Sequence, residues 1–188
     1  MKNIAIFASG SGTNAQKIME HFENRKDVKV CLVLVNNPEA GVIERAQKFN
    51  VPVFKFNRQQ FNKSNDVVDI LLNYQIDMVV LAGFLWLVPT QMVQAFPNKI
   101  INIHPALLPN YGGKGMYGDN VHKAVIAAKE LESGITIHYV NEQYDDGAII
   151  AQYKCTISKG DSPEDLASKI HKLEHEFFPK VIDQILSN

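Results

Sequence analysis

Short apolar runs alternate along the chain with segments whose apolar residues recur at helical spacing. The runs are rich in Val, Ile and Leu and have few polar interruptions, which is typical of strands buried on both faces of a parallel sheet. The predicted strands cover residues 3–8, 28–35, 51–56, 77–83 and 99–103. The predicted helices cover residues 14–24, 39–49, 66–74 and 89–96. This alternation predicts an α/β fold with a mostly parallel, Rossmann-like sheet and helices on both faces.

The last third of the chain departs from strict alternation. A predicted helix at residues 121–129 is followed by two predicted strands, 134–140 and 148–157, with only a short acidic turn between them. We therefore expect an antiparallel C-terminal strand addition to the sheet. The sequence SPED at residues 162–165 places Ser, Pro and Asp at the N-cap, first and third positions of a closing helix. We find no repeat or linker and predict a single domain over residues 1–188.

Composition narrows the class of protein. The 19 Lys and Arg residues nearly balance the 20 Asp and Glu residues, and no basic stripe typical of nucleic-acid binding is present. No apolar run approaches the roughly 20 residues that span a bilayer, and the N-terminus turns into a glycine loop too early for a signal peptide. We therefore expect a cytoplasmic protein. Cys31 and Cys155 lie in apolar strands without metal-type spacing, so we expect both to be reduced core residues.

The first candidate site is the glycine turn SGSGTN at residues 9–14, between the first strand and the first helix. Its glycines and the following Ala15 have the spacing of a dinucleotide fingerprint, and such a turn directs backbone amides at an anion. A dinucleotide site should also have an acidic residue after the second strand, where this chain has Asn36 and Asn37. A simple phosphate cradle is therefore favoured, and a tight turn without a ligand is the alternative. The cradle residues are Gly12, Thr13 and Asn14.

The second candidate site is the sequence INIHPALLPNYGG at residues 101–113. Asn102 and His104 lie at the carboxyl end of a buried strand, which is where parallel sheets bind their ligands. Pro105 and Pro109 stiffen the loop that follows. A lone histidine more often packs in a core, but an amide and an imidazole at this position favour oxyanion stabilisation and acid–base chemistry.

For two further segments the sequence leaves two interpretations open. Asp145 and Asp146 follow the strand that contains His138, and they form either a solvated turn or a turn whose carboxylate folds back to stabilise charged His104. The sequence FLWLV at residues 84–88 contains the only tryptophan. It either packs in the core or lines a site for a flat heteroaromatic ligand.

Five segments taken together resemble the folate-dependent formyltransferases. They are SGSGTN at residues 9–14, LAGFLWLVP at 81–89, INIHPALLPNYGGKG at 101–115, SGITIHYV at 133–140 and YDDGAIIAQ at 144–152. The resemblance extends over nearly the whole chain. It implies that the formyl group of the co-substrate 10-formyltetrahydrofolate passes to the amine of 5-phosphoribosylglycinamide, a step of purine biosynthesis that needs no metal.

The resemblance also implies a role for individual residues. Asn102 would donate a hydrogen bond to the formyl oxygen, His104 would be the proton donor, and Asp145 would favour the charged imidazole and order a water that relays the proton. The substrate phosphate would bind to Gly12, Thr13 and Asn14, and the glycinamide side to Glu174. The folate would contact Arg58, Leu85, Trp86, Leu87, Val88 and Asn102.

Three rival interpretations use the same residues. A formyltetrahydrofolate hydrolase would use water in place of the amine, so a strict requirement for the amine excludes it. A nicotinamide-dependent oxidoreductase would need a ribose-binding acid where Asn36 stands. A binding module without catalysis would use only the glycine turn, and would leave the polar groups of Asn102 and His104 without a task.

Overall fold

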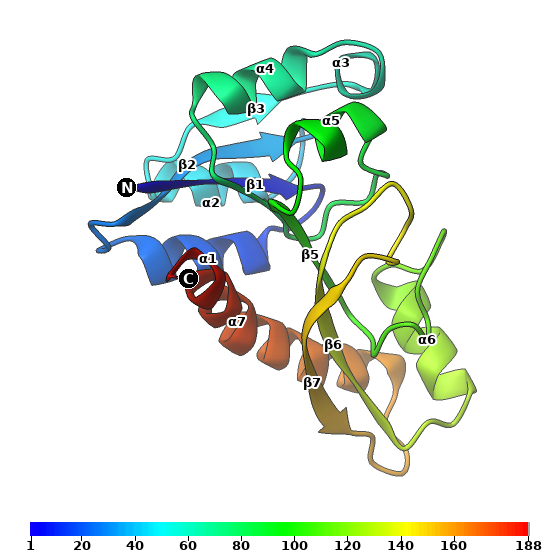
Figure 1. Ribbon diagram of the computed structural model, residues 1–188. Helices are drawn as coiled ribbons and strands as arrows, with labels where there is room; N and C mark the ends of the chain where they lie inside the picture. Colours follow the sequence, from blue (N-terminus) through cyan, green and yellow to red (C-terminus); the bar gives the residue numbers. More distant parts are fainter. Residues whose placement is uncertain (188) are drawn as a thin grey trace. The chain divides into compact units, whose positions relative to one another are not determined.

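The computed structural model describes residues 1–187. The chain divides into two compact units, Met1–Ile101 (unit 1) and Asn102–Asn188 (unit 2). The strand order is β3-β2-β1-β4-β5-β6-β7, and Figure 1 labels the elements. The predicted class, a Rossmann-like α/β fold with an antiparallel C-terminal addition, is confirmed. The expectation of a single domain stays a prediction.

Unit 1 contains the parallel part of the sheet. Its elements are β1 (Lys2–Ala8), α1 (Thr13–Phe22), β2 (Val28–Val35), α2 (Val42–Lys48), β3 (Val53–Lys55), α3 (Arg58–Asn62), α4 (Asp66–Asn73), β4 (Met78–Leu81), α5 (Thr90–Ala95) and the start of β5 (Ile100–His104). β1 pairs in parallel with both β2 and β4, and β2 pairs in parallel with β3. The chain therefore moves outward to β3 and then returns across β1 to β4. Because such crossovers are right-handed, α1 and α2 cover one face and α4 and α5 the other (Figure 1).

The change of direction falls between β1 and β4. Ligands of open α/β sheets bind at the carboxyl ends of the strands at such a switch point. The turn after β1 and the loop after β4 both lie there, and they are tied together. The backbone N–H of Ser9 donates to the Gly83 carbonyl at 3.1 Å, and the Ser9 hydroxyl accepts from the Leu85 N–H at 3.2 Å.

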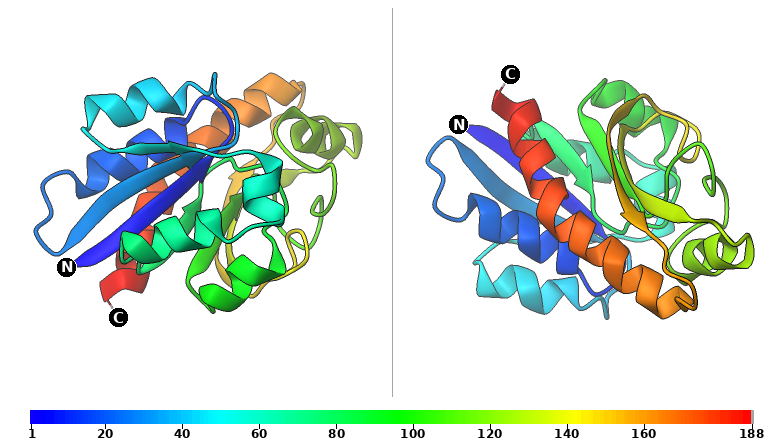
Figure 2. Two further views of the ribbon diagram at one scale, coloured as in Figure 1. Left: turned by 90° about the horizontal axis from the view of Figure 1, so that it is seen from above. Right: turned by 90° about the horizontal axis from the view of Figure 1, so that it is seen from below.

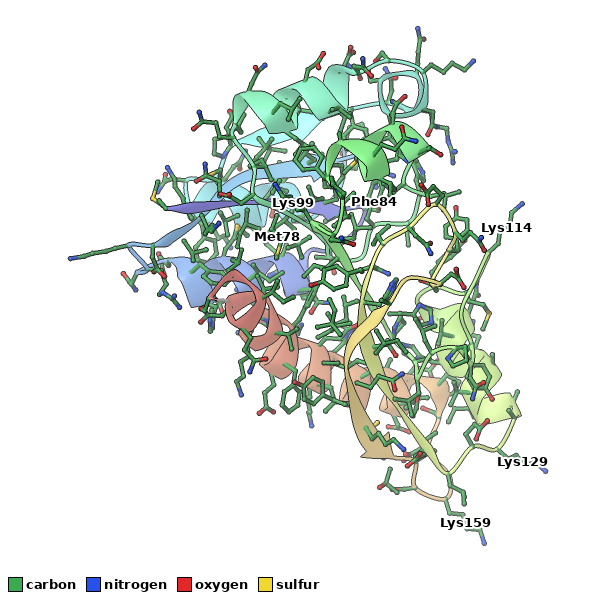
Figure 3. The ribbon with its side chains drawn as sticks, viewed as in Figure 1. Met78, Phe84, Lys99, Lys114, Lys129 and Lys159 are labelled. Carbon is green, nitrogen blue, oxygen red and sulfur yellow. The ribbon has the colours of Figure 1, made fainter. Side chains whose placement is uncertain are left out.

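The core of unit 1 contains a cluster of aromatic rings. Phe7, Phe56, Phe61 and Phe84 are all buried, and their ring centroids lie 5.2–6.2 Å apart. The pairs Phe7–Phe56, Phe7–Phe84 and Phe61–Phe84 are edge-to-face, an arrangement that contributes about 0.5–1.5 kcal/mol per pair beyond the buried area. Figure 3 shows Phe84 and Met78 inside this unit, whereas Lys114, Lys129 and Lys159 project from unit 2.

Unit 2 contains the end of β5 and the antiparallel pair. Its other elements are α6 (Asp119–Ala127), β6 (Glu132–Tyr139), β7 (Ile149–Thr156) and α7 (Pro163–Ser187). The start of α7 is confirmed, since Ser162 and Asp165 exchange hydrogen bonds of 2.9 and 3.1 Å in a capping box. Figure 2 shows that α7 continues as one helix through Pro179.

Two helices differ from the sequence predictions. α2 begins at Val42 rather than at residue 39, because the Asn37 side chain accepts from the Glu39 N–H at 3.0 Å and stabilises a turn there. α3 was not predicted. It begins with a capping box in which the Asn57 and Gln60 side chains bind each other's backbone N–H at 3.0 Å, a signal that the sequence N-x-x-Q does contain. No helix within residues 1–187 is long and apolar enough to cross a membrane.

Candidate active site

The proline loop after β5 is held by two polar side chains of the antiparallel pair. The fully buried Thr136 hydroxyl of β6 accepts from the Leu108 N–H at 2.9 Å and donates to the Ala106 carbonyl at 2.7 Å. Gln152 of β7 donates to the Leu108 carbonyl and to the Thr136 hydroxyl, both at 2.9 Å. Replacing Thr136 by an apolar residue would leave buried backbone groups unpaired, at a cost of about 1–3 kcal/mol each. The loop is therefore fixed by more than its prolines, and sequence reasoning did not identify Thr136.

Asn102 contacts His138 at the end of β6. The Asn102 amide nitrogen lies 3.1 Å from His138 Nε2, and His138 Nδ1 lies 2.8 Å from the Tyr139 carbonyl oxygen. A carbonyl oxygen only accepts, so Nδ1 must carry a proton. In the neutral ring Nε2 then has a lone pair, and the Asn102 NH₂ group must face it. The sequence analysis named His138 but gave it no role, although its place two residues after Thr136 puts both on one face of β6.

Asp145 is the carboxylate that lies beside the two histidines. Its Oδ2 is 3.5 Å from His104 Nδ1 and its Oδ1 is 3.7 Å from His138 Nε2. Oδ2 also accepts from the Gly113 N–H at 2.9 Å. Asp146 instead accepts from Asn141 at 3.1 Å in an exposed contact. Of the two arrangements considered for this turn, the structure has the one in which Asp145 lies against His104.

The pairing of β6 with β7, the two strands that this turn connects, is irregular next to His138. The register of β6 against β7 shifts between Ile137 and His138. Such shifts often re-aim a side chain next to a functional site. Gly147 then packs against the Tyr139 carbonyl so closely that a Cβ there would overlap the oxygen. The glycine of the DDG turn thus permits the carbonyl position that fixes the His138 tautomer.

His104 is 3% exposed, and both of its ring nitrogens face acceptors. Nε2 lies 2.8 Å from the Tyr111 carbonyl oxygen, and Nδ1 faces Asp145. A doubly protonated ring satisfies both partners, whereas a neutral ring would point a lone pair at one of them. To act on a substrate, His104 must exchange one of these contacts. Such exchange is common, because catalytic hydrogen bonds often tighten only in the substrate complex.

The pKa values of His138 and His171, both in unit 2, are shifted in opposite directions by their surroundings. Burial lowers the pKa of His138, against the opposing effects of the Tyr139 carbonyl and the Asp145 carboxylate. The hydrogen bond that half-exposed His171 donates to the Glu174 carboxylate raises the pKa of His171. His138 is therefore the ring that stays neutral near physiological pH.

Glu174 lies in α7 and is 5% exposed. Its carboxylate is 3.0 Å from His171 Nδ1. His122 of α6 is buried as well, and burial lowers its pKa. The carboxylate is thus buried and paired with His171, and a buried ionisable group of this kind is a candidate for a functional site.

The glycine turn of unit 1 has the geometry of an anion-binding nest. Gly12, the N-cap of α1, has φ 76° and ψ 26°, and Thr13 and Asn14 begin the helix. A left-handed residue followed by a helical one points successive N–H groups to one side, and the helix dipole adds positive charge there. A Cβ at Gly12 would collide with the Val42 side chain, so only glycine fits. Asn36 follows β2 where a dinucleotide site would have an acid.

The loop after β4 packs partly in the core and is partly exposed, and its binding of a flat heteroaromatic ligand stays a prediction. Trp86 is partly buried against Phe56, Phe61 and Phe84, with ring centroids 5.9–6.1 Å apart. The guanidinium of Arg58 lies 4.5 Å from the Trp86 ring centroid, a cation–π contact. Leu85 and Leu87 are 46% and 38% exposed, whereas Val88 is buried. The loop is thus anchored in the core and presents an apolar surface.

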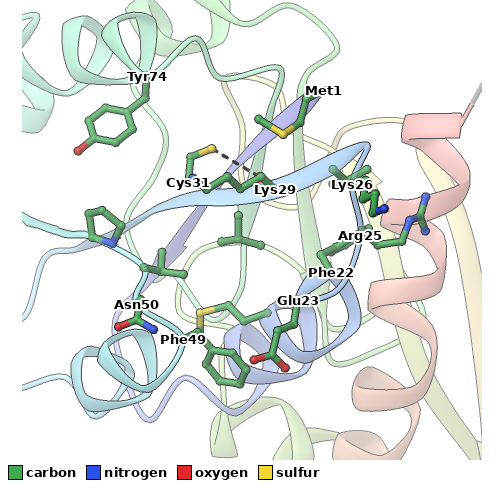
Figure 4. A pocket seen from close by; sticks show the side chains of 15 residues that line it. Met1, Phe22, Glu23, Arg25, Lys26, Lys29, Cys31, Phe49, Asn50 and Tyr74 are labelled. Carbon is green, nitrogen blue, oxygen red and sulfur yellow. Dashed lines mark hydrogen bonds between the residues drawn. The ribbon is translucent and has the colours of Figure 1, made fainter.

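Unit 1 also contains a cavity of about 590 Å³ (Figure 4). It is lined by residues at the end of α1 and the start of β2, among them Phe22, Arg25 and Val28. It therefore lies at the amino end of β2, away from the carboxyl ends where the glycine turn and the Trp86 loop lie. No group of three or more residues suited to metal binding occurs within residues 1–187.

A doubly wound sheet with a phosphate-type turn after its first strand and an Asn–His–Asp cluster after β5 defines an α/β group-transfer enzyme. The family model described as formyl transferase matches residues 2–182. The chain therefore belongs to the formyl transferase family, and the resemblance noted from the sequence is confirmed.

Individual relatives agree with this assignment. The chain is 42% identical to the chloroplastic phosphoribosylglycinamide formyltransferase of Arabidopsis thaliana over 98% of its own length, and spans 65% of that protein. It is 39% identical to the phosphoribosylglycinamide formyltransferase of Bacillus subtilis, covering 99% of this chain and 95% of that one. The crystal structure of the Bacillus halodurans phosphoribosylglycinamide formyltransferase matches with a TM-score of 0.88 at 37% identity, covering 100% and 96% of the two chains.

Proposed function

We propose that this protein transfers the formyl group of 10-formyltetrahydrofolate to the amine of 5-phosphoribosylglycinamide in purine biosynthesis. The observation that carries the proposal is the cluster of Asn102, His104 and Asp145, in which an amide, an imidazole and a carboxylate lie together on a rigid loop and turn. The names of the relatives support the choice of substrates.

The reaction needs an oxyanion site and a route for one proton. The amine attacks the formyl carbon, a C–N bond forms, and the carbonyl oxygen takes the negative charge. The Asn102 N–H that does not face His138 donates to this oxygen, and charged His104 donates a second hydrogen bond. The proton lost by the new ammonium group reaches N10 of the folate by way of a water held by Asp145, and the C–N10 bond breaks. Formylated amine and tetrahydrofolate are the products.

The binding assignments follow the local chemistry of each unit. The nest at Gly12, Thr13 and Asn14 suits the substrate phosphate. The glycinamide side is assigned to Glu174, a buried carboxylate that accepts hydrogen bonds. The folate is assigned to Arg58, Leu85, Trp86, Leu87, Val88 and Asn102. An arginine stacked on an indole suits a ligand that combines a flat ring with carboxylates.

The test is a turnover assay with purified protein. The absorbance change of 10-formyltetrahydrofolate is followed with and without 5-phosphoribosylglycinamide, and the product is identified by mass spectrometry. We expect conversion only with the amine, and a mass increase that corresponds to one formyl group. Formate release without the amine would identify a hydrolase, and calorimetric binding of a nicotinamide dinucleotide would favour an oxidoreductase. Absence of turnover with both substrates present would refute the proposal.

We also propose that the reaction takes place in the cytoplasm. Cys31 and Cys155 are both free thiols, and burial raises the pKa of each, which disfavours the reactive thiolate. Both are partly buried rather than enclosed in the core. Localisation of a fluorescent fusion of the full chain in its own cell tests this proposal.

A further inference from the structure

Arg45 of α2 reaches back to the glycine turn of unit 1. Its Nε donates to the Ser11 carbonyl at 2.8 Å, and its Nη1 donates to the side-chain oxygen of Gln16 in α1. The guanidinium is thus joined to the residue before Gly12 and to the first turn of the helix after it.

The contact with Ser11 sets the direction of a backbone amide. In a trans peptide unit the carbonyl and the N–H point in opposite directions. Because the Ser11 carbonyl points at Arg45, the Gly12 N–H of the same peptide unit points away from Arg45. The carbonyls of Gly10 and Gly12 are already used, since they accept from Val42 and Gln16 at 3.2 and 2.9 Å. The next N–H groups belong to the first turn of α1, where the helix offers no acceptor.

The packing under the turn leaves little freedom. The first residue of α2, Val42, lies directly beneath Gly12, and a Cβ on Gly41 would lie 3.3 Å from the Ser11 carbonyl oxygen. Arg45 follows one helical turn later. Both groups that accept from Arg45 are uncharged, so these contacts leave its positive charge without a neutralising carboxylate.

We infer that Arg45 is a positioning residue of the phosphate site: it holds the Ser11 peptide so that the amides at the start of α1 face a phosphate, and it places a positive charge behind the turn. The inference rests on the proposed function, which assigns the substrate phosphate to this turn. Arginine suits the task because its planar fork donates in two fixed directions and stays charged at every physiological pH. Lysine has all of its donors on one nitrogen at the end of a flexible stem and cannot make both contacts in the same geometry.

A residue that merely stabilises the fold would affect any substrate, whereas a phosphate-positioning residue affects only a substrate with a phosphate. The test therefore compares 5-phosphoribosylglycinamide with its dephosphorylated form, ribosylglycinamide, in the full chain. Arg45→Met should raise KM for the phosphorylated substrate by roughly tenfold or more, the value of one hydrogen bond to a charged group. kcat and the dissociation constant of a folate analogue should change little, and kcat/KM for ribosylglycinamide should be unaffected.

Two variants complete the experiment. Arg45→Lys keeps the charge and should recover part of the affinity for the phosphorylated substrate. Lys48→Met removes a positive charge from the exposed end of the same helix and should behave like the wild type. If Arg45→Met does not fold, the same two substrates are compared in Arg45→Lys and the wild type. KM should then rise for 5-phosphoribosylglycinamide, and kcat/KM for ribosylglycinamide should stay unchanged.

The outcomes separate the inference from the proposed function. Equal losses for the two substrates, or an unchanged KM for the phosphorylated one, would overturn the role of Arg45 while leaving the enzyme's activity intact. If the wild type shows no turnover, the proposed function fails. Calorimetric titration of 5-phosphoribosylglycinamide into wild type and Arg45→Met then tests the inference alone, and equal affinities would overturn it.

Discussion

The side-chain amide of Asn102 lies 3.1 Å from Nε2 of His138, and the opposite nitrogen of that ring is bound to the Tyr139 carbonyl. The carbonyl determines the tautomer of His138, and the tautomer determines which side of the Asn102 amide faces it. One N–H of Asn102 is therefore directed away from His138 without any substrate present. Such preorganisation removes the cost of orienting a donor during the reaction.

This arrangement predicts that His138 is neutral with its proton on Nδ1. Nitrogen NMR of the imidazole rings should show Nδ1 protonated and Nε2 bare at pH 7.5. His138→Gln keeps an acceptor near the Nε2 position and should retain more turnover than His138→Ala, which should lose on the order of 10²-fold because the amide is no longer oriented. Protonated Nε2 at pH 7.5, or equal losses in the two variants, would contradict the assignment.

The lowered pKa of His138 also has a consequence for stability. The unfolded chain, with a His pKa of about 6.5, binds this proton more readily than the folded protein does. The contribution of the neutral ring is therefore complete above about pH 6.5 and is lost as the pH falls below it. Urea unfolding between pH 5 and 7.5 should show a smaller acid-induced loss of unfolding free energy in His138→Gln than in the wild type. A larger loss in the variant would show that the sign is wrong.

Asp145 and Asp146 form a matched pair for testing the carboxylate. Asp145→Asn removes the charge beside His104 and His138 while nearly preserving shape, and turnover should drop on the order of 10²-fold, as for loss of an acid–base group. Asp146→Asn changes only an exposed contact with Asn141 and should stay within a factor of about two of the wild type. Steady-state kinetics at saturating concentrations of both substrates decides this, and a larger effect of Asp146→Asn would show that the wrong carboxylate was assigned.

Gly12 and Gly10 offer the same kind of comparison in the glycine turn. Gly12→Ala puts a side chain at φ 76° and against Val42, which should lower the free energy of unfolding by about 1–2 kcal/mol or more. It should also weaken the binding of 5-phosphoribosylglycinamide far more than the binding of a folate analogue, because the new side chain obstructs only the glycine turn. At Gly10 a Cβ meets nothing within 4 Å, so Gly10→Ala should change little. Titration calorimetry that finds equal losses for both ligands in Gly12→Ala would rule out a phosphate site here.

Trp86 reports on the loop after β4. As the only tryptophan it gives the whole indole fluorescence of the protein. A folate analogue that stacks near the Arg58–Trp86 pair should quench or shift this emission, whereas 5-phosphoribosylglycinamide alone should leave it unchanged. An unchanged spectrum at saturating folate analogue would remove Trp86 from the folate site.

The local order of the chain could be predicted from sequence because it depends on short-range patterns. Apolar runs place β1, β2, β4 and β5, and the Ser162–Asp165 capping box places the start of α7, since both signals come from neighbours along the chain. The late start of α2 and the existence of α3 depend on single side-chain contacts at Asn37 and Asn57, which compete with weak helix preferences.

The candidate residues Asn102, His104 and Asp145 could be named from the sequence because strand ends and acidic turns are readable. The contacts that bring these residues together could not be predicted from the sequence. Asp145 rather than Asp146 lies beside His104 and accepts from the Gly113 N–H, and the orientation of Asn102 follows from a ring held by the Tyr139 carbonyl. Arg45 and Thr136 act across 34 and 30 residues of chain on the Ser11 and Ala106 carbonyls. Hydrogen bonds between such distant residues leave no periodic trace in a sequence, so only the tertiary structure decided them.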